Sequence, residues 1–145
     1  MCNTIRPMCP NDKPHILDMM REFYASPAVF TNGSDTIFSK DIDNCLNNNP
    51  YIEGYVIEEA GEIQGYAMIA KSFSTEFGKT CIWIEDLYIK EPCRGLGLGR
   101  RLLKFITDTY TDCIFRLEVE EENERAVRLY ETCGFTVLPY KEMKK

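Results

Sequence analysis

Histidine is almost absent from this sequence, and that absence limits the chemistry open to it. His15 is the only histidine among 145 residues, and it falls in the first turn of an expected helix. A Ser-His-Asp triad needs a histidine as proton carrier, and catalytic zinc sites commonly use two or three. The sequence therefore disfavours triad catalysis and metal-dependent hydrolysis, and we expect no metal site.

Paired cysteines are also missing. The seven cysteines are odd in number and scattered, and no two have the Cys-x-x-Cys spacing of zinc or redox sites. Cys81 and Cys113 interrupt apolar runs, where a free thiol behaves as a small hydrophobic side chain. We expect all seven to be reduced.

Long apolar runs and a surplus of basic residues are absent as well. No stretch approaches the roughly 20 apolar residues that span a bilayer, and residues 1–7 do not resemble a signal peptide. The net charge is −6, whereas nucleic-acid binding requires a surplus of lysine or arginine on some face. We expect a soluble cytoplasmic protein with no membrane or nucleic-acid partner. The acidic balance is compatible with cationic substrates, although net charge more often serves solubility alone.

The apolar content that is present suffices for one domain. Hydrophobic residues make up 44% of the chain and aromatic residues 12%, at a length typical of a single domain. No repeat, low-complexity tract or linker divides the chain, so we predict one domain over residues 1–145.

The spacing of apolar residues and breakers predicts a mixed order of helices and strands. Helices are expected from the cap at residues 11–14 to before Pro27, from a Ser39 cap to the breaker at 47–50, and over 100–110 and 122–133. Strands are expected at 5–7, as a hairpin of 51–58 and 63–71, and at 80–90, 113–119 and 135–143. Residues 80–90 are almost continuously apolar, which places them at the centre of the sheet. Strands before the glycine-rich turn should be antiparallel, and a helical crossover should follow it.

The sharpest motif is Arg94-Gly95-Leu96-Gly97-Leu98-Gly99, between the buried strand and an amphipathic helix. Alternate glycines allow close backbone approach, and the free N–H groups at a helix start bind anions such as a pyrophosphate, here beside Arg94 and Arg100. A dinucleotide fold has Gly-x-Gly-x-x-Gly in a parallel unit, and a Walker loop ends in Gly-Lys-Ser or Gly-Lys-Thr; neither fits. A flexible connector is the remaining structural alternative.

Two motifs resemble the GNAT superfamily of N-acetyltransferases. Arg94-x-x-Gly97-x-Gly99 resembles its acetyl-CoA signature, and Asn123, Ala126 and the segment from Tyr130 to Gly134-Phe135 resemble its later motif. The two motifs cover roughly residues 80–136. The resemblance implies an α+β fold with a mostly antiparallel sheet that splays between strands 4 and 5, flanked by about four helices. It also implies acetyl-CoA as cosubstrate, with pantetheine in the split.

The resemblance also guides the expected cosubstrate contacts. Asn123 would hydrogen-bond the pantetheine arm, and backbone groups at Leu87 and Ile89 would pair with it like an extra strand. One N–H there would polarise the thioester carbonyl. The expected binding residues are Leu87, Tyr88, Ile89, Arg94, Gly95, Leu96, Gly97, Leu98, Gly99, Arg100, Asn123, Ala126 and Tyr130.

Glu85 and Asp86 interrupt the buried run, where carboxylates are costly unless paired or facing a cavity. Adjacent strand residues point to opposite faces, so one carboxylate could serve a site while the other holds structure. A carboxylate beside Trp83 and Leu87 would have a raised pKa, which suits a general base acting through water. The order Ile84-Glu85-Asp86-Leu87 also resembles the polyamine-acetylating branch, in which the residue matching Glu85 is proposed as base. A purely structural role for Glu85 stays equally open.

Tyr130 lies on the inward face of its expected helix. The resemblance assigns the matching tyrosine the role of general acid that protonates the departing thiolate; a core aromatic is the alternative. The acidic run 118–124 has the composition of a solvated strand end and helix start. Phe23, Tyr24 and Phe30 bracket the loop where the family often builds its acceptor pocket, but core packing explains them equally well.

These residues together predict an acetyl-CoA-dependent N-acetyltransferase, an acyltransferase acting on a small-molecule amine. We expect direct attack by a neutral primary amine in a ternary complex, with no covalent enzyme intermediate and a small cationic amine as acceptor. A CoA-binding regulatory or degenerate module and a protein amino-group acetyltransferase are the alternatives. The sequence is compatible with a homodimer.

Overall fold

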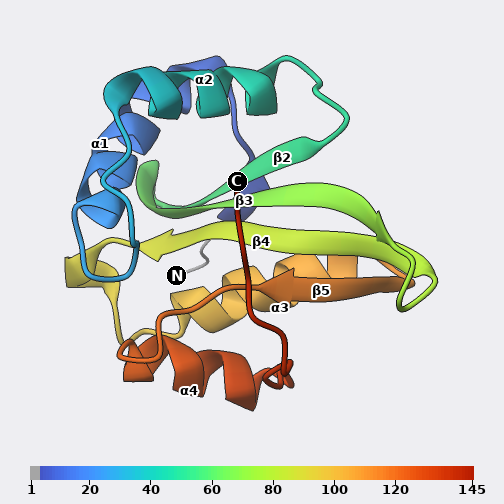
Figure 1. Cartoon of the computed structure of the whole chain (residues 1–145). Coiled ribbons are helices and arrows are strands. Elements are labelled where there is room, and N and C mark those ends of the chain that lie inside the picture. Colours follow the sequence, from blue (N-terminus) through green and yellow to red (C-terminus); the bar gives the residue numbers. More distant parts are fainter. Residues whose placement is uncertain (1–3) are drawn as a thin grey trace.

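The computed structural model describes residues 4–145, so Cys2 and the amino-terminal segment before Thr4 lie outside the description (Figure 1). Five strands form one sheet in the order β1-β2-β3-β4-β5. They are β1 (Thr4–Pro7), β2 (Ile52–Glu59), β3 (Glu62–Ser74), β4 (Lys79–Ile89) and β5 (Cys113–Leu117). The first four pair antiparallel, and β5 pairs parallel with β4. The predicted mostly antiparallel sheet is confirmed, and the run at 80–90 is an interior strand.

Helices pack on both faces of this sheet (Figure 1). They are α1 (Lys13–Tyr24), α2 (Asp35–Leu46), α3 (Leu98–Thr109) and α4 (Glu124–Thr132), with short 3-10 turns η1 (Pro10–Asp12) and η2 (Glu91–Cys93). One core joins α1 and α2 to the sheet, including Met20, Ile42 and Tyr66. The other joins α3 to the opposite face, including Leu102, Ile82 and Ile84. Burial on both faces explains why β4 is apolar almost throughout.

Two helices begin earlier than the sequence predicts. Ser34, not Ser39, caps α2: its Oγ accepts from the Ile37 N–H at 3.2 Å, and Ser39 lies inside the helix. Helix α3 begins at Leu98 because Gly97, with φ of 78°, provides its N-cap. The Ser34 side chain satisfies one free N–H of the first turn of α2, whereas Gly97 caps α3 without a side-chain bond and leaves the first N–H groups of that helix free.

The predicted closing strand at 135–143 is wrong. Residues 135–145 form neither helix nor strand. Figure 1 shows this segment crossing β5 and β4 instead of running along the free edge of β5. The segment therefore has no neighbouring strand for a ladder, and Pro139 has no N–H to donate to one.

The six cysteines in residues 4–145 are free thiols, in agreement with the expectation of reduced cysteines. No helix between residues 4 and 145 has the length and apolar character needed to cross a membrane.

Candidate active site

The sheet opens between β4 and β5. Their pairing runs from Thr80 opposite Cys113 to Ile84 opposite Leu117 and ends there. Beyond that pair, β4 continues to Ile89 against β3, while the chain after β5 turns toward α4 (Figure 1). The predicted splay between the fourth and fifth strands is present. Along this opening, residues 85–89 have no strand beside them on the β5 side, which leaves backbone groups there able to pair with a ligand.

A β-bulge in β4 lies at the apex of this split. Met68 is opposite Asp86 and Ile69 is opposite Ile84, so Glu85 is the extra, unpaired residue. The Asp86 carboxylate lies on the α1–α2 side of the sheet, where it accepts a hydrogen bond from the Tyr24 hydroxyl of α1. The extra residue interrupts the strand alternation from which opposite faces were expected, so the faces of Glu85 and Asp86 stay a prediction.

Asp86 is held by two phenols. It is 3% exposed and accepts hydrogen bonds from the hydroxyls of Tyr24 at 2.8 Å and Tyr66 at 2.7 Å. Burial raises the pKa of Asp86 to about 6, although both hydrogen bonds favour the ionised form. Asp86 is therefore the carboxylate that holds structure, since it ties the end of α1 to β4 and β3.

Glu85 is the more accessible of the two carboxylates. Its side chain reaches solvent, yet partial desolvation raises its pKa, with smaller contributions from Glu142 and Asp41. Such a position suits a group that exchanges a proton with a ligand or water. The base role expected for Glu85 stays a prediction.

Further carboxylates surround Glu85. The last residue pair between β4 and β5 is Ile84 with Leu117. Glu85 follows Ile84 in the chain and Glu118 follows Leu117, so these two residues flank the apex of the split. The neighbouring Glu142 carboxyl, together with burial, raises the pKa of Glu118 to about 7. Burial also raises the pKa of Asp41 on α2. Sequence reasoning treated Glu118 as solvated and missed Asp41 and Glu142, which reach the site from distant parts of the chain.

The glycine loop has the backbone form expected of an anion site. Gly95 and Gly97 have φ of 82° and 78°, in the left-handed region that favours glycine. A Cβ on Gly97 would meet no described atom within 4 Å, so the surface above it is open. A Cβ on Gly99 would meet Leu129 Cδ2 at 3.2 Å, so the third glycine serves the packing of α3 against α4. The start of α3 is thus accessible to an anion.

The two arginines beside this loop make protein contacts. Arg94 donates from Nε to the Ile89 carbonyl at 2.9 Å, and its guanidinium lies 5.4 Å from the centre of the Tyr88 ring. Arg100 donates to Thr132 Oγ1 at 3.0 Å. Arg94 therefore occupies the Ile89 carbonyl, one of the groups expected to pair with pantetheine.

Tyr130 lies half-buried on α4, with its ring edge-to-face against Phe135 at 6.0 Å. Burial raises its pKa to about 12, so the phenol is protonated at neutral pH. Among residues 4–145 its hydroxyl has no hydrogen-bond partner, which leaves its proton available to a ligand. The turn after it is fixed, because the Phe135 N–H donates to the Tyr130 carbonyl at 3.0 Å and Gly134 has φ of 96°.

Asn123 has a structural role as well as the expected ligand role. Its Oδ1 accepts from the Ala126 N–H at 3.4 Å and caps α4. The cap occupies the carbonyl oxygen of the Asn123 side chain and leaves its amide N–H groups for a ligand.

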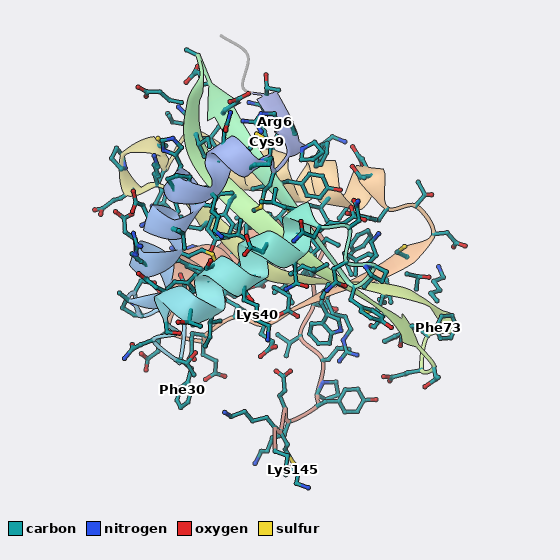
Figure 2. The ribbon with its side chains drawn as sticks, turned by 90° about the horizontal axis from the view of Figure 1, so that it is seen from above. Arg6, Cys9, Phe30, Lys40, Phe73 and Lys145 are labelled. Carbon is teal, nitrogen blue, oxygen red and sulfur yellow. The ribbon has the colours of Figure 1, made fainter. Side chains whose placement is uncertain are left out.

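A cavity of about 690 Å³ adjoins Arg94 and the end of β4. Its walls come from α1, from Tyr88 and from η2, and its lining residues are Asp18, Met19, Glu22, Ser26, Tyr88, Lys90, Glu91, Pro92 and Arg94. Of the aromatic residues considered for an acceptor pocket, Phe23 and Tyr24 pack against the α1–α2 core, and Phe30 is 89% exposed (Figure 2). Within residues 4–145, no group of three or more His, Cys, Asp or Glu side chains could hold a metal ion.

Comparison with known proteins agrees with this geometry. The model of the acetyltransferase (GNAT) family matches residues 16–135. Thialysine N-epsilon-acetyltransferase of Sus scrofa is 33% identical, over 90% of this chain and 82% of its own. Spermine/spermidine N(1)-acetyltransferase of Bacillus subtilis is 28% identical over 52% of this chain and 53% of its own.

Solved structures share the fold. A possible acetyltransferase from Clostridium difficile superimposes with a TM-score of 0.82 at 19% identity, over 100% of this chain and 97% of its own. A predicted acetyltransferase from Clostridium acetobutylicum, solved with acetyl-CoA, gives a TM-score of 0.77 at 17% identity, over 99% and 96%. With the split sheet, the bulge and the glycine loop in place, the chain belongs to the GNAT acetyltransferase family.

Proposed function

We propose that this acetyltransferase transfers an acetyl group from acetyl-CoA to the primary amine of a small cationic acceptor, by direct attack in a ternary complex. The observation that carries the proposal is the position of Glu85. It is the unpaired residue of the β4 bulge, at the apex of the split and among other carboxylates. A base at that position can deprotonate an amine beside a ligand lying in the split.

The residues of the split and the loop fit the cosubstrate. The open surface above Gly97 and the accessible start of α3 suit the pyrophosphate, and the bare β4 edge at Leu87 and Tyr88 suits the pantetheine amides. When bound, acetyl-CoA supplies an activated acetyl thioester. Asn123 and Ala126 stand at the start of α4 on the other side of the split.

Two side chains of the chain move the protons. Glu85 accepts the proton of the acceptor ammonium, directly or through a water, because its raised pKa brings it closer to neutral pH. Tyr130 supplies a proton to the thiolate that leaves, because its own pKa of about 12 keeps the phenol protonated. No cysteine is required in either step.

The charge of the site supports a cationic acceptor. Glu142 contributes to the raised pKa of both Glu118 and Glu85, and Glu85 contributes to that of Glu118. A bound ammonium relieves that repulsion, whereas a neutral or anionic acceptor does not. The names of two relatives, a thialysine and a spermine/spermidine acetyltransferase, point to amines of this class.

A thiol-release assay with acetyl-CoA and a panel of amines tests the proposal. Diamines, polyamines and basic amino acids should release CoA, and their Michaelis constants should rise with ionic strength because salt screens the carboxylates. Glycine and an amino-terminal peptide without lysine provide the comparison. Acetylation of those two alone would exclude the cationic acceptor, and no release with any amine would exclude turnover altogether.

A further inference from the structure

One face of helix α4 lies against the glycine loop and the start of α3 (Figure 1). Near its carboxyl end, Thr132 Oγ1 accepts a hydrogen bond of 3.0 Å from Arg100. Three residues earlier, the Leu129 side chain packs so closely that a Cβ on Gly99 would meet it at 3.2 Å. Residues 125, 129 and 132 are spaced four and three apart, so they share this face of the helix. The same face therefore presents Arg125 to the loop.

Arg125 reaches the first glycine of the loop. A Cβ built on Gly95 would lie 3.7 Å from Arg125 Nη2. Two residues further on, the surface above Gly97 is open, and the first N–H groups of α3 are free because the Gly97 cap makes no side-chain bond. The guanidinium of Arg125 and the free N–H groups of α3 thus belong to the same short loop, although they come from different helices.

Arg125 differs from Arg94 and Arg100 in its contacts. Arg94 donates to the Ile89 carbonyl at 2.9 Å, and Arg100 donates to Thr132. In the part of the chain from residue 4 to 145, the Arg125 side chain makes no hydrogen bond or ion pair, and it is exposed. A guanidinium has a planar fork of N–H donors that matches two oxygens of a phosphate. Arg125 can therefore bind a phosphate without giving up a contact within the protein.

We propose that Arg125 is a further cosubstrate-binding residue, whose guanidinium binds the diphosphate of acetyl-CoA from the α4 side of the glycine loop. The inference rests on the proposed function for the identity of the cosubstrate. The helix start supplies N–H donors with only partial charge, whereas Arg125 supplies a full positive charge and a bidentate contact. The bound diphosphate then links the start of α3 to α4.

This link matters because α4 is the helix with the least burial. Helices α1, α2 and α3 each contain fully buried residues, whereas none of the residues of α4 is fully buried. The helix also carries Tyr130, and Asn123 caps it. A contact from Arg125 to the diphosphate adds a fixed point at the amino end of α4. Cosubstrate binding should therefore stabilise the helix that holds the expected proton donor.

Titration calorimetry with CoA and with 3′-dephospho-CoA tests the contact. Arg125→Gln should weaken both ligands equally, by about tenfold, because both contain the diphosphate. Arg125→Lys should recover part of the affinity, since it keeps the charge but not the bidentate fork. Arg128→Gln is the matched control, because Arg128 is an exposed arginine of the same helix. Urea unfolding without ligand should give all three variants the same stability as the wild type.

Three results in these titrations would overturn the proposal. A loss with CoA but not with 3′-dephospho-CoA would assign Arg125 to the 3′-phosphate. An equal loss in Arg125→Gln and Arg128→Gln would assign the effect to the overall charge of the helix. Unchanged affinity in Arg125→Gln would show that the guanidinium does not contact the cosubstrate.

Hydrogen exchange of the α4 amides tests the link between the helices. Saturating CoA should slow this exchange in the wild type, and Arg125→Gln saturated with CoA should show about threefold less protection. Equal protection in the two proteins would refute the link. Binding of CoA through Arg125 without transfer to any amine would refute the proposed function and leave this inference standing. Transfer to amines with unchanged affinity in Arg125→Gln would do the reverse, and a wild type that does not bind CoA would refute both.

Discussion

The hydroxyl of Tyr24, the last residue of α1, donates a 2.8 Å hydrogen bond to the buried carboxylate of Asp86 in β4. This bond joins the first helix to β4 directly beside the bulge. The loop between α1 and α2 begins just after Tyr24, so one carboxylate fixes both the strand and the start of that loop. The pair therefore couples the stability of the fold to the geometry of the site.

Burial of Asp86 makes stability depend on pH. Its pKa rises from 3.8 to about 6 on folding, so its contribution is complete below pH 3.8 and is lost as the pH rises through 6. The change amounts to about 3 kcal/mol. Asp86→Asn should remove this decline between pH 4 and 6, measured by urea unfolding at several pH values. If the free energies of unfolding of the variant and the wild type declined in parallel between pH 4 and 6, the decline would not come from Asp86.

Asp12 should act in the opposite direction. Arg6 donates to its two carboxylate oxygens at 2.8 and 2.9 Å and lowers its pKa from 3.8 to about 2. Its stabilisation is present above pH 3.8 and is lost as the pH falls through 2. Asp12→Asn should cost about 2 kcal/mol at pH 7 by urea unfolding, and the variant and wild type should converge near pH 2. A constant difference across this range would refute the assignment.

Gly97→Val should weaken acetyl-CoA binding at least tenfold, or about 1.4 kcal/mol, by titration calorimetry. The side chain would fill the open surface above the loop. Gly78→Val is a matched control, because Gly78 also has a left-handed φ and open space but lies in the β3–β4 turn. Both variants carry the same backbone strain. An equal loss in the two would assign the effect to strain and not to the binding site.

Tyr130→Phe should lower turnover by about 10²-fold while coenzyme affinity hardly changes. The substitution removes the proton donor and keeps the ring that packs on Phe135. Tyr110→Phe is the control, since Tyr110 bonds Glu53 and Tyr55 away from the split. The measurement is the steady-state turnover of both variants, under conditions where the chemical step limits the rate. If Tyr130→Phe kept the wild-type turnover, Tyr130 would serve only in the packing of the core.

Glu85→Gln should lower the rate and remove the acidic limb of its pH profile. Because a base works only when deprotonated, activity in the wild type should fall as the pH drops through the raised pKa of Glu85. Glu62→Gln, on the exposed start of β3, is the control for a lost surface charge. The measurement is kcat/KM against pH with a saturating coenzyme, and an unchanged limb in Glu85→Gln would assign it to another group.

Structural features that depend on residues close together in the chain could be predicted from the sequence. The glycine turn before α3, the hairpin of β2 and β3, and Gly134 at the end of α4 each depend on nearby residues. The bulge could not be predicted, because it depends on the register between β3 and β4. Glu142 was missed because its approach to Glu118 depends on the path of a segment without regular structure. The prediction of a closing strand at 135–143 was wrong for a related reason. A segment of β-forming residues becomes a strand only beside a partner strand, and the local sequence does not show whether one is near.

The bare edge of β4 has a consequence for solubility. A strand edge with unpaired N–H and C=O groups is a template for another chain, and proteins protect such edges with charged side chains. Glu85 and Glu118 directly follow the last β4–β5 pair, beside this edge, and charged side chains at such a position oppose pairing with the strand of another molecule. A double substitution to glutamine would remove both safeguards at once. Edge-to-edge aggregates of that double variant would dissociate on dilution. A loss of turnover that persists in dilute protein would therefore be due to catalysis and not to aggregation.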